Sequence, residues 1–163
     1  MFNIKKSLKK YIDDNLIEKE RSSFVGKMAR CACFGDYEEA SINDYINNNN
    51  DENIFQTLLF KYIDDRELKD SDVYNKVHID RRLFSKIRSD KDYHPSKETV
   101  ILLGIALELS EKELDDLLAS ASYSLPKNNK YDLIIRFCFI NKIFNISDIN
   151  DLLDEYHCRL FNY

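Results

Sequence analysis

Apolar residues recur along most of this chain at the three- and four-residue spacing that places side chains on one face of an α-helix. The pattern is clearest where isoleucine, leucine and phenylalanine alternate with pairs of charged residues. It predicts helices at Met1–Lys19, Ile54–Asp65, Asp70–Val77, Asp80–Arg88, Lys97–Leu107, Ser110–Leu118, Tyr131–Asn141 and Ser147–Tyr156.

Four of these stretches begin at a residue that suits a helix N-terminus. Asp, Ser and Asn side chains accept hydrogen bonds from the first free backbone N–H groups of a helix. Ser110 is followed three residues later by Glu113, which is the pattern of a capping box. We therefore expect helices to begin behind Asp80, Ser96, Ser110 and Ser147.

The helix predicted at Lys97–Leu107 is apolar on almost every side. A helix of this kind is buried on all sides in a folded protein. The segment Tyr131–Tyr156 carries a matching excess of apolar side chains, so we expect it to pack on Leu102 and Ile105. Its first part, YDLIIRFCFIN, favours a buried helix, although the pattern is also compatible with a strand.

The composition favours an all-α protein. The 163 residues include only 3 glycines and 2 prolines, whereas sheet proteins need many turn residues. No apolar run approaches the length of a membrane span, and the short, charged N-terminus is unlike a signal peptide. These features predict a cytoplasmic protein that is not inserted in a membrane.

The segment from Ile54 to Ser120 resembles the helix-turn-helix domain of the phage lambda repressor and Cro type. The resemblance rests on a short helix, a turn and a second short helix, followed by Pro95-Ser96, Glu98-Thr99 and a run ending in Ser110. The matching apolar and small positions are Val73, Val77, Ile79, Ser85, Ile87, Leu103, Leu109, Leu114, Leu117 and Leu118. It implies a five-helix core, with an N-terminal helix and a C-terminal helical hairpin added.

This resemblance divides the chain into three parts. Residues 1–53 would form a helical appendage with a linker at Asn47–Asn50, residues 54–120 the helix-turn-helix domain, and residues 121–163 an extension packed on it. The chain departs from the family pattern at Tyr74, at His78, and at Asp70 and Asp72, where the family usually has a neutral polar residue. Tyr74 stands where the family has a small residue, and His78 stands where it has glycine.

A narrower resemblance covers the wording IDRRLFSKIRS, then Tyr93, Pro95-Ser96-Lys97 and ALEL. It is similar to a module that recurs in Gram-positive bacteria and their mobile elements. This likeness implies an association with phage or mobile elements and no particular chemistry.

Charge is distributed unevenly along the chain. The net charge of −5 is unusual for a dedicated nucleic-acid protein. Between Lys76 and Lys91, however, six basic residues stand against two acidic ones, so this stretch is net +4 and the remainder −9. The candidate DNA contacts are Arg81 and Arg82 for base edges, and Lys86, Arg88 and Lys91 for phosphates. Asp70 and Asp72, in contrast, would repel DNA.

No catalytic or metal-binding motif is evident. Cys31 and Cys33 are too few for a zinc site, which takes four ligands, and we interpret them as packing residues. Neighbouring acids such as Asp115 and Asp116 point to different helix faces. The sequence therefore predicts a protein without enzyme activity, cofactor, metal or small-molecule substrate.

Two classes of function stay open at this point. One is a sequence-specific DNA-binding regulator of transcription. The other is a protein-interaction module that keeps the fold without binding DNA, as an adaptor or inhibitor in phage defence or counter-defence. A protein partner or a second copy of the chain would then replace DNA.

Overall fold

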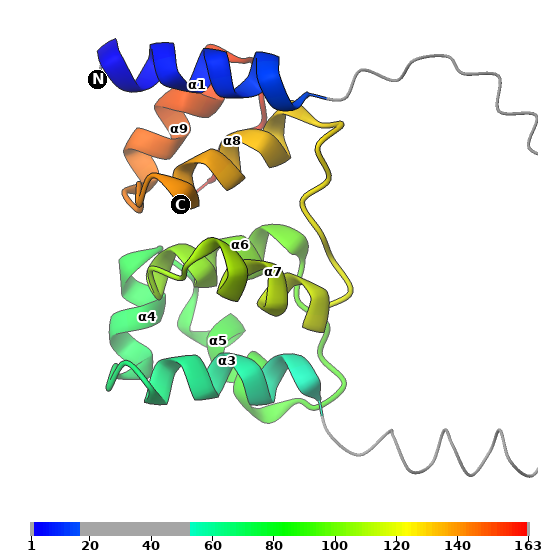
Figure 1. Cartoon of the computed structure of the whole chain (residues 1–163). Coiled ribbons are helices and arrows are strands. Elements are labelled where there is room, and N and C mark those ends of the chain that lie inside the picture. The colour runs from blue at the N-terminus through cyan, green and yellow to red at the C-terminus, as the bar shows by residue number, and fades with distance from the viewer. Residues whose placement is uncertain (1, 17–52, 163) are drawn as a thin grey trace, which may run out of the picture.

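The structure is a computed structural model that describes residues 2–16 and 53–162, with side chains from residue 4 onward (Figure 1). All regular elements in these ranges are α-helices, which confirms the all-α prediction and excludes a strand at YDLIIRFCFIN. The helices are α1 (Phe2–Asn15), α3 (Ile54–Asp64), α4 (Asp70–Lys76), α5 (Arg81–Ser89), α6 (Lys97–Ala106), α7 (Glu111–Ser120), α8 (Lys130–Ile140) and α9 (Ile146–Glu155). Cys31, Cys33 and the linker at Asn47–Asn50 lie outside the described residues.

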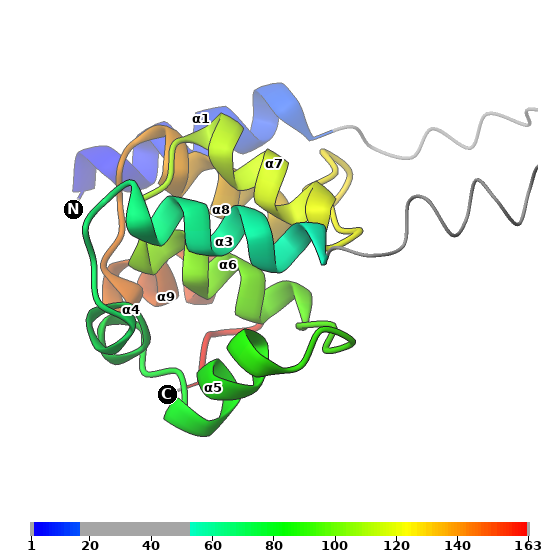
Figure 2. The ribbon, with the colours of Figure 1, turned by 90° about the horizontal axis from the view of Figure 1, so that it is seen from below.

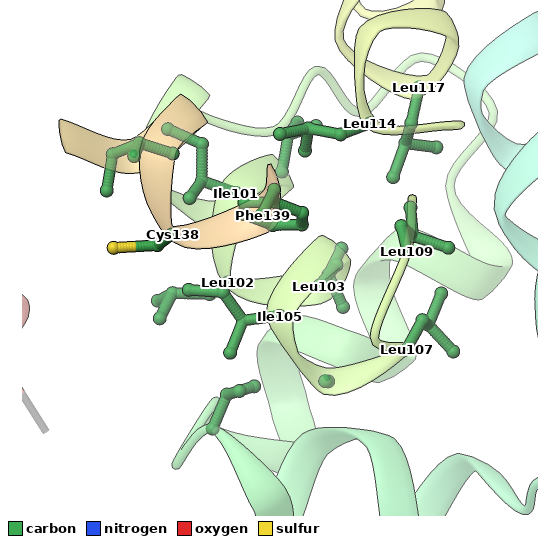
Figure 3. Packing of buried hydrophobic residues seen from close by; sticks show 14 of the residues in the cluster. Ile101, Leu102, Leu103, Ile105, Leu107, Leu109, Leu114, Leu117, Cys138 and Phe139 are labelled. Atoms are coloured by element: carbon green, nitrogen blue, oxygen red, sulfur yellow. The ribbon is translucent and has the colours of Figure 1, made fainter. Parts of the chain in front are cut away.

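Helix α6 lies at the centre of the molecule. From Thr99 to Ala106 every one of its side chains is buried. It packs against α4 and α7, and α8 covers a further side through Phe139 (Figure 3). A helix without a polar face needs such neighbours on all sides. The prediction that this helix is enclosed is therefore confirmed.

Gly104 marks the closest approach of three helices. A Cβ atom built on Gly104 would lie 2.9 Å from Cδ1 of Leu114 on α7 and 3.3 Å from Cζ of Phe139 on α8. Both distances are shorter than ordinary van der Waals contact between carbon atoms. The missing side chain at this position allows α7 and α8 to approach α6 together.

Helix α8 is attached to α6 and α7 by polar contacts as well. Lys97 Nζ lies 2.6 Å from Oδ1 of Asp132, whose side chain is only 2% exposed. Arg136 donates to both carboxylate oxygens of Asp115, at 2.8 and 2.9 Å, and to Glu111 at 2.6 Å. Burial by itself would lower the pKa of Arg136, but these hydrogen bonds raise it above its ordinary value. Leu102 and Ile105 are 9% and 0% exposed, so both are covered.

Helix α1 packs on α8, although more than a hundred residues separate them in sequence. Leu8 and Ile12 are buried, and the Tyr11 ring lies 5.5 Å from that of Phe137, centroid to centroid. Lys5 forms an ion pair with Glu155 at 3.1 Å. Helices α1, α8 and α9 thus form one layer beside the group α3–α7 (Figure 1). None of the helices in the described ranges is both long and apolar enough to cross a membrane.

The helix N-termini follow the predicted caps with one exception. Asp80, Ser96 and Ser110 each accept a hydrogen bond from the first turn of α5, α6 and α7, and Ser110 forms the predicted capping box with Glu113. The prediction for Ser147 was wrong. Asn145 caps α9 by accepting from the backbone N–H groups of Ser147 and Asp148, at 2.9 and 3.3 Å. Asn is as good a cap as Ser, so the earlier residue starts the helix.

The C-terminal ends of six helices share an unusual backbone conformation. Helices α3, α4, α6, α7, α8 and α9 are each followed by a non-glycine residue with φ between 51° and 60°: Glu67, His78, Glu108, Ser122, Lys142 and His157. After each, the next N–H donates to a carbonyl five residues earlier, as in Leu68 to Ile63 at 3.2 Å. This is the Schellman motif, which usually places glycine at the left-handed position. The scarcity of glycine leaves these positions under steric strain.

The strain at Glu67 leads to a prediction. Glu67→Gly should be more stable than Glu67→Ala by about 0.5–1 kcal/mol, because only the alanine variant keeps a Cβ at a left-handed φ. Both variants remove the acid from the C-terminal end of α3, so charge cancels in the comparison. Midpoints of urea unfolding would measure the difference. At the exposed interior position Lys61 the order should reverse, with glycine less stable than alanine by roughly 1 kcal/mol.

A second prediction concerns Gly104. Gly104→Ala should destabilise the protein by about 1–3 kcal/mol, because the added methyl group meets Leu114 and Phe139. Helix propensity alone predicts the opposite sign, since alanine is favoured in a helix interior by roughly 0.5–1 kcal/mol. In a Leu114→Ala background the loss should shrink, which a double-mutant cycle of unfolding free energies would detect. A stabilised Gly104→Ala variant would contradict this packing.

Candidate nucleic-acid interface

The candidate interface is formed by α4, the turn after it and α5. The turn is anchored by Val77 and Ile79, whose side chains are 3% and 8% exposed. Between them His78 has φ of 54°, and the N–H of Ile79 donates to the carbonyl of Tyr74 at 2.9 Å. Because histidine tolerates this conformation better than β-branched residues do, the turn forms without a glycine at this position. Asp80 then starts α5 by accepting from the N–H of Arg82 at 2.6 Å.

Apolar packing fixes the inner face of α5. Phe84 and Ile87 are 2% and 1% exposed. Tyr74, half-buried on α4, lies with its ring 5.7 Å from that of Phe84. The bulky residue at position 74 is thus accommodated by an aromatic contact between the two helices.

Helix α3 holds the C-terminal end of α5 through two side-chain amides. Nε2 of Gln56 donates to the carbonyl of Ile87 at 2.7 Å and to that of Asp90 at 2.6 Å. Nδ2 of Asn53 donates to the carbonyl of Lys91 at 2.6 Å. These bonds satisfy carbonyls that a helix end leaves without partners. Sequence reasoning did not find them, because they join residues more than 30 positions apart.

All five predicted contact residues, Arg81, Arg82, Lys86, Arg88 and Lys91, are exposed on α5 or directly after it. They differ in whether their charged groups form contacts with other side chains of the protein. Lys86 Nζ lies 4.8 Å from the ring centroid of Tyr93. Among the described residues, the side chains of Arg81, Arg82 and Lys91 have no hydrogen bond, ion pair or ring contact.

Arg88 is held by two neighbours. Its Nη2 lies 2.5 Å from Oδ1 of Asp70 at the start of α4, and its Cζ lies 4.1 Å from the centroid of the Phe60 ring on α3. The acid that we expected to repel DNA is thus paired within the protein. The other acid, Asp72, accepts hydrogen bonds from the N–H of Lys69 and the hydroxyl of Ser71, both at 3.4 Å.

A hollow of about 390 Å³ lies between α4 and α5. The cations Lys69, Arg81 and Arg88 line it together with Asp70, while the Tyr74 and Phe84 rings form apolar walls. Three positive charges and one negative charge make the hollow net positive. Helix α5 is at the end of the molecule away from α1, so this region faces outward (Figure 2).

A larger hollow, about 1060 Å³, lies where α1, the end of α4 and the α8–α9 connection meet. Its charges are of both signs, with Lys5 paired to Glu155 and Lys76 to Glu108. Within residues 2–16 and 53–162 no group of three or more His, Cys, Asp or Glu side chains is arranged to hold a metal ion. Burial raises the pKa of the Cys138 thiol to about 12, so this thiol stays protonated and unreactive at neutral pH.

The outward face of α5 carries Arg81 and Arg82, whose guanidinium groups have no partner among the described residues. Comparisons with protein-family models, with curated proteins and with solved structures gave no match.

Proposed function

We propose that α3–α7 is a helix-turn-helix domain and that the protein is a sequence-specific DNA-binding regulator that reads DNA with α5. The observation that carries this proposal is the state of Arg81 and Arg82. Both are exposed at the start of α5, and among the described residues their guanidinium groups have no partner. Unpaired arginines at the first turn of the second motif helix suit contact with base edges.

The geometry of α5 supports this use. The major groove of B-DNA is about 12 Å wide and admits one α-helix. With Phe84 and Ile87 facing inward, the opposite face of α5 is free to enter the groove. There Arg81 and Arg82 would reach guanine O6 and N7, which arginine binds with two hydrogen bonds. Lys86 and Lys91 would contact phosphates and set the register.

Anchoring of α5 would help such recognition. The bonds from Gln56 and Asn53 fix the end of the helix, and the α4–α5 turn is fixed by buried side chains. Because the helix is held before DNA arrives, little conformational entropy is lost when it binds. The overall charge of −5 works against association, so affinity should fall steeply with salt.

The alternative function is a protein-interaction module without DNA binding. It is favoured by the larger hollow, beside which Ile4 stands 41% exposed. An exposed isoleucine next to buried Leu152 would suit an apolar side chain of a protein partner. The two functions differ in whether Arg82 or Ile4 determines binding.

A selection from random-sequence duplexes tests the DNA proposal. The full chain should enrich a defined site, and Arg82→Ala should relax the preference at one or two positions, because a base contact is lost. Lys86→Ala should weaken binding to all sequences alike and reduce the salt slope by about one unit, since it removes a phosphate contact. Fluorescence anisotropy over a salt series would measure both effects.

The matched control is Lys112→Ala, which removes an exposed lysine from α7. It should leave both the preferred sequence and the salt slope unchanged. Failure to enrich any sequence at low salt, together with equal behaviour of the Arg82→Ala and Lys112→Ala variants, would reject the DNA proposal and favour a protein partner.

A further inference from the structure

The hollow between α4 and α5 combines two opposed features. It gathers Lys69, Arg81 and Arg88, which attract an anion, and it contains Asp70, which repels one. Asp70 and Arg88 form an ion pair across the hollow, joining the first turn of α4 to the last turn of α5. The acid therefore neutralises one of the cations on the face proposed to meet DNA.

This ion pair lies within reach of an approaching phosphate. The Arg88 side chain is 51% exposed and that of Asp70 is 36% exposed. The Phe60 ring, 4.1 Å from Cζ of Arg88, also contacts the guanidinium through a cation–π interaction. Two contacts therefore hold the Arg88 guanidinium, one with Asp70 and one with Phe60. A DNA phosphate must compete with Asp70 to bind it.

The competition has two outcomes, and both weaken attraction to the DNA backbone. If Arg88 stays with Asp70, its charge is unavailable to DNA. If Arg88 turns to a phosphate, the carboxylate of Asp70 is left beside that phosphate and repels it. Backbone contacts carry no sequence information, whereas the contacts from Arg81 and Arg82 to bases would. The attraction that is lost is therefore of the sequence-independent kind.

We propose that Asp70 regulates the strength of DNA binding: it withholds Arg88 from the DNA backbone and so lowers the sequence-independent part of the affinity. This inference rests on the proposed DNA-binding function. It assigns an intramolecular role to Arg88 in place of the phosphate contact predicted from the sequence, and it makes the acid at the start of α4 part of the recognition surface.

Asp72 supplies an internal control on the same helix turn. It carries the same charge two residues further along, but it does not line the hollow and forms no ion pair with Arg88. Asp70→Asn and Asp72→Asn make the same change in net charge and in the charge near the α4 N-terminus. Only the first change releases Arg88.

The experiment measures binding of the full chain to a labelled random-sequence duplex between 50 and 200 mM salt. Asp70→Asn should tighten binding about three- to tenfold at the lowest salt and steepen the salt slope by about 0.9, the value for one added phosphate contact. Between 50 and 200 mM salt, the affinity advantage of Asp70→Asn over the wild type should shrink about three- to fourfold. Asp72→Asn should leave the slope unchanged.

Arg88 provides the second half of the test. In the wild-type background, Arg88→Ala should change the salt slope little, because Arg88 is already engaged. In the Asp70→Asn background the same substitution should remove the added 0.9 unit. Thermal unfolding of each variant establishes that it is folded at the temperature of the binding measurement.

The possible failures are distinguishable. Equal slopes for Asp70→Asn and Asp72→Asn, with wild-type binding intact, would overturn the role of Asp70 and leave the DNA-binding function standing. If Arg88→Ala in the wild-type background lowered the salt slope by one unit, the proposed role of Asp70 would also be overturned, since Arg88 would then contact a phosphate directly. If neither the wild type nor Asp70→Asn binds duplex at 50 mM salt, the DNA-binding function itself fails.

Discussion

The burial of α6 from Thr99 to Ala106 is the constraint on which the rest of the structure depends. Each large apolar side chain of this helix contributes about 1.5–3 kcal/mol when it is removed from water. That contribution is available only if neighbouring elements cover every side, as α4, α7 and α8 do here. Gly104 lets two of these neighbours approach closely, so one small residue links the packing of α6 to that of α7 and α8. The C-terminal helices are therefore part of the core.

This arrangement decides which surface remains for function. Helices α4, α7 and α8 all pack against α6, and α5 packs against α4. Helix α1 lies at the end of the molecule opposite α5 (Figure 2). The polar face of α5 is consequently turned outward, while its apolar face is closed by Phe84 and Ile87. A recognition helix requires that combination of a fixed inner face and an open outer one.

Ion pairing determines how much positive charge this surface offers. Arg66, Lys76, Arg88, Lys97 and Arg136 each lie within 2.9 Å of a carboxylate oxygen. The two exposed pairs among them, Lys76–Glu108 and Arg88–Asp70, add little to stability. They do reduce the number of cations that an external anion can attract without competition. Among the arginines in the described part of the chain, Arg66, Arg88, Arg136 and Arg159 form ion pairs, whereas Arg81 and Arg82 do not.

Much of the local structure was determined by the sequence itself. Helical periodicity and capping act between residues within about four positions, so Asp80, Ser96 and Ser110 could be recognised as helix starts from their neighbours alone. The enclosure of α6 followed from its lack of a polar face. The start of α9 was predicted wrongly at Ser147, because Asn145 and Ser147 both suit an N-cap and the local sequence does not select between them.

Only the tertiary structure decided the contacts between distant segments. The docking of α1 on α8, the amide bonds from Gln56 to the end of α5 and the pairing of Arg88 with Asp70 join residues 18 or more positions apart. Many pairs of lysine, arginine and acid side chains in this sequence are chemically equivalent, so residue type does not select the partners. The path of the backbone selects them, because it brings α4 and α5 together around one hollow, in which Asp70 pairs with Arg88 and, among the described residues, Arg81 and Arg82 form no ion pair.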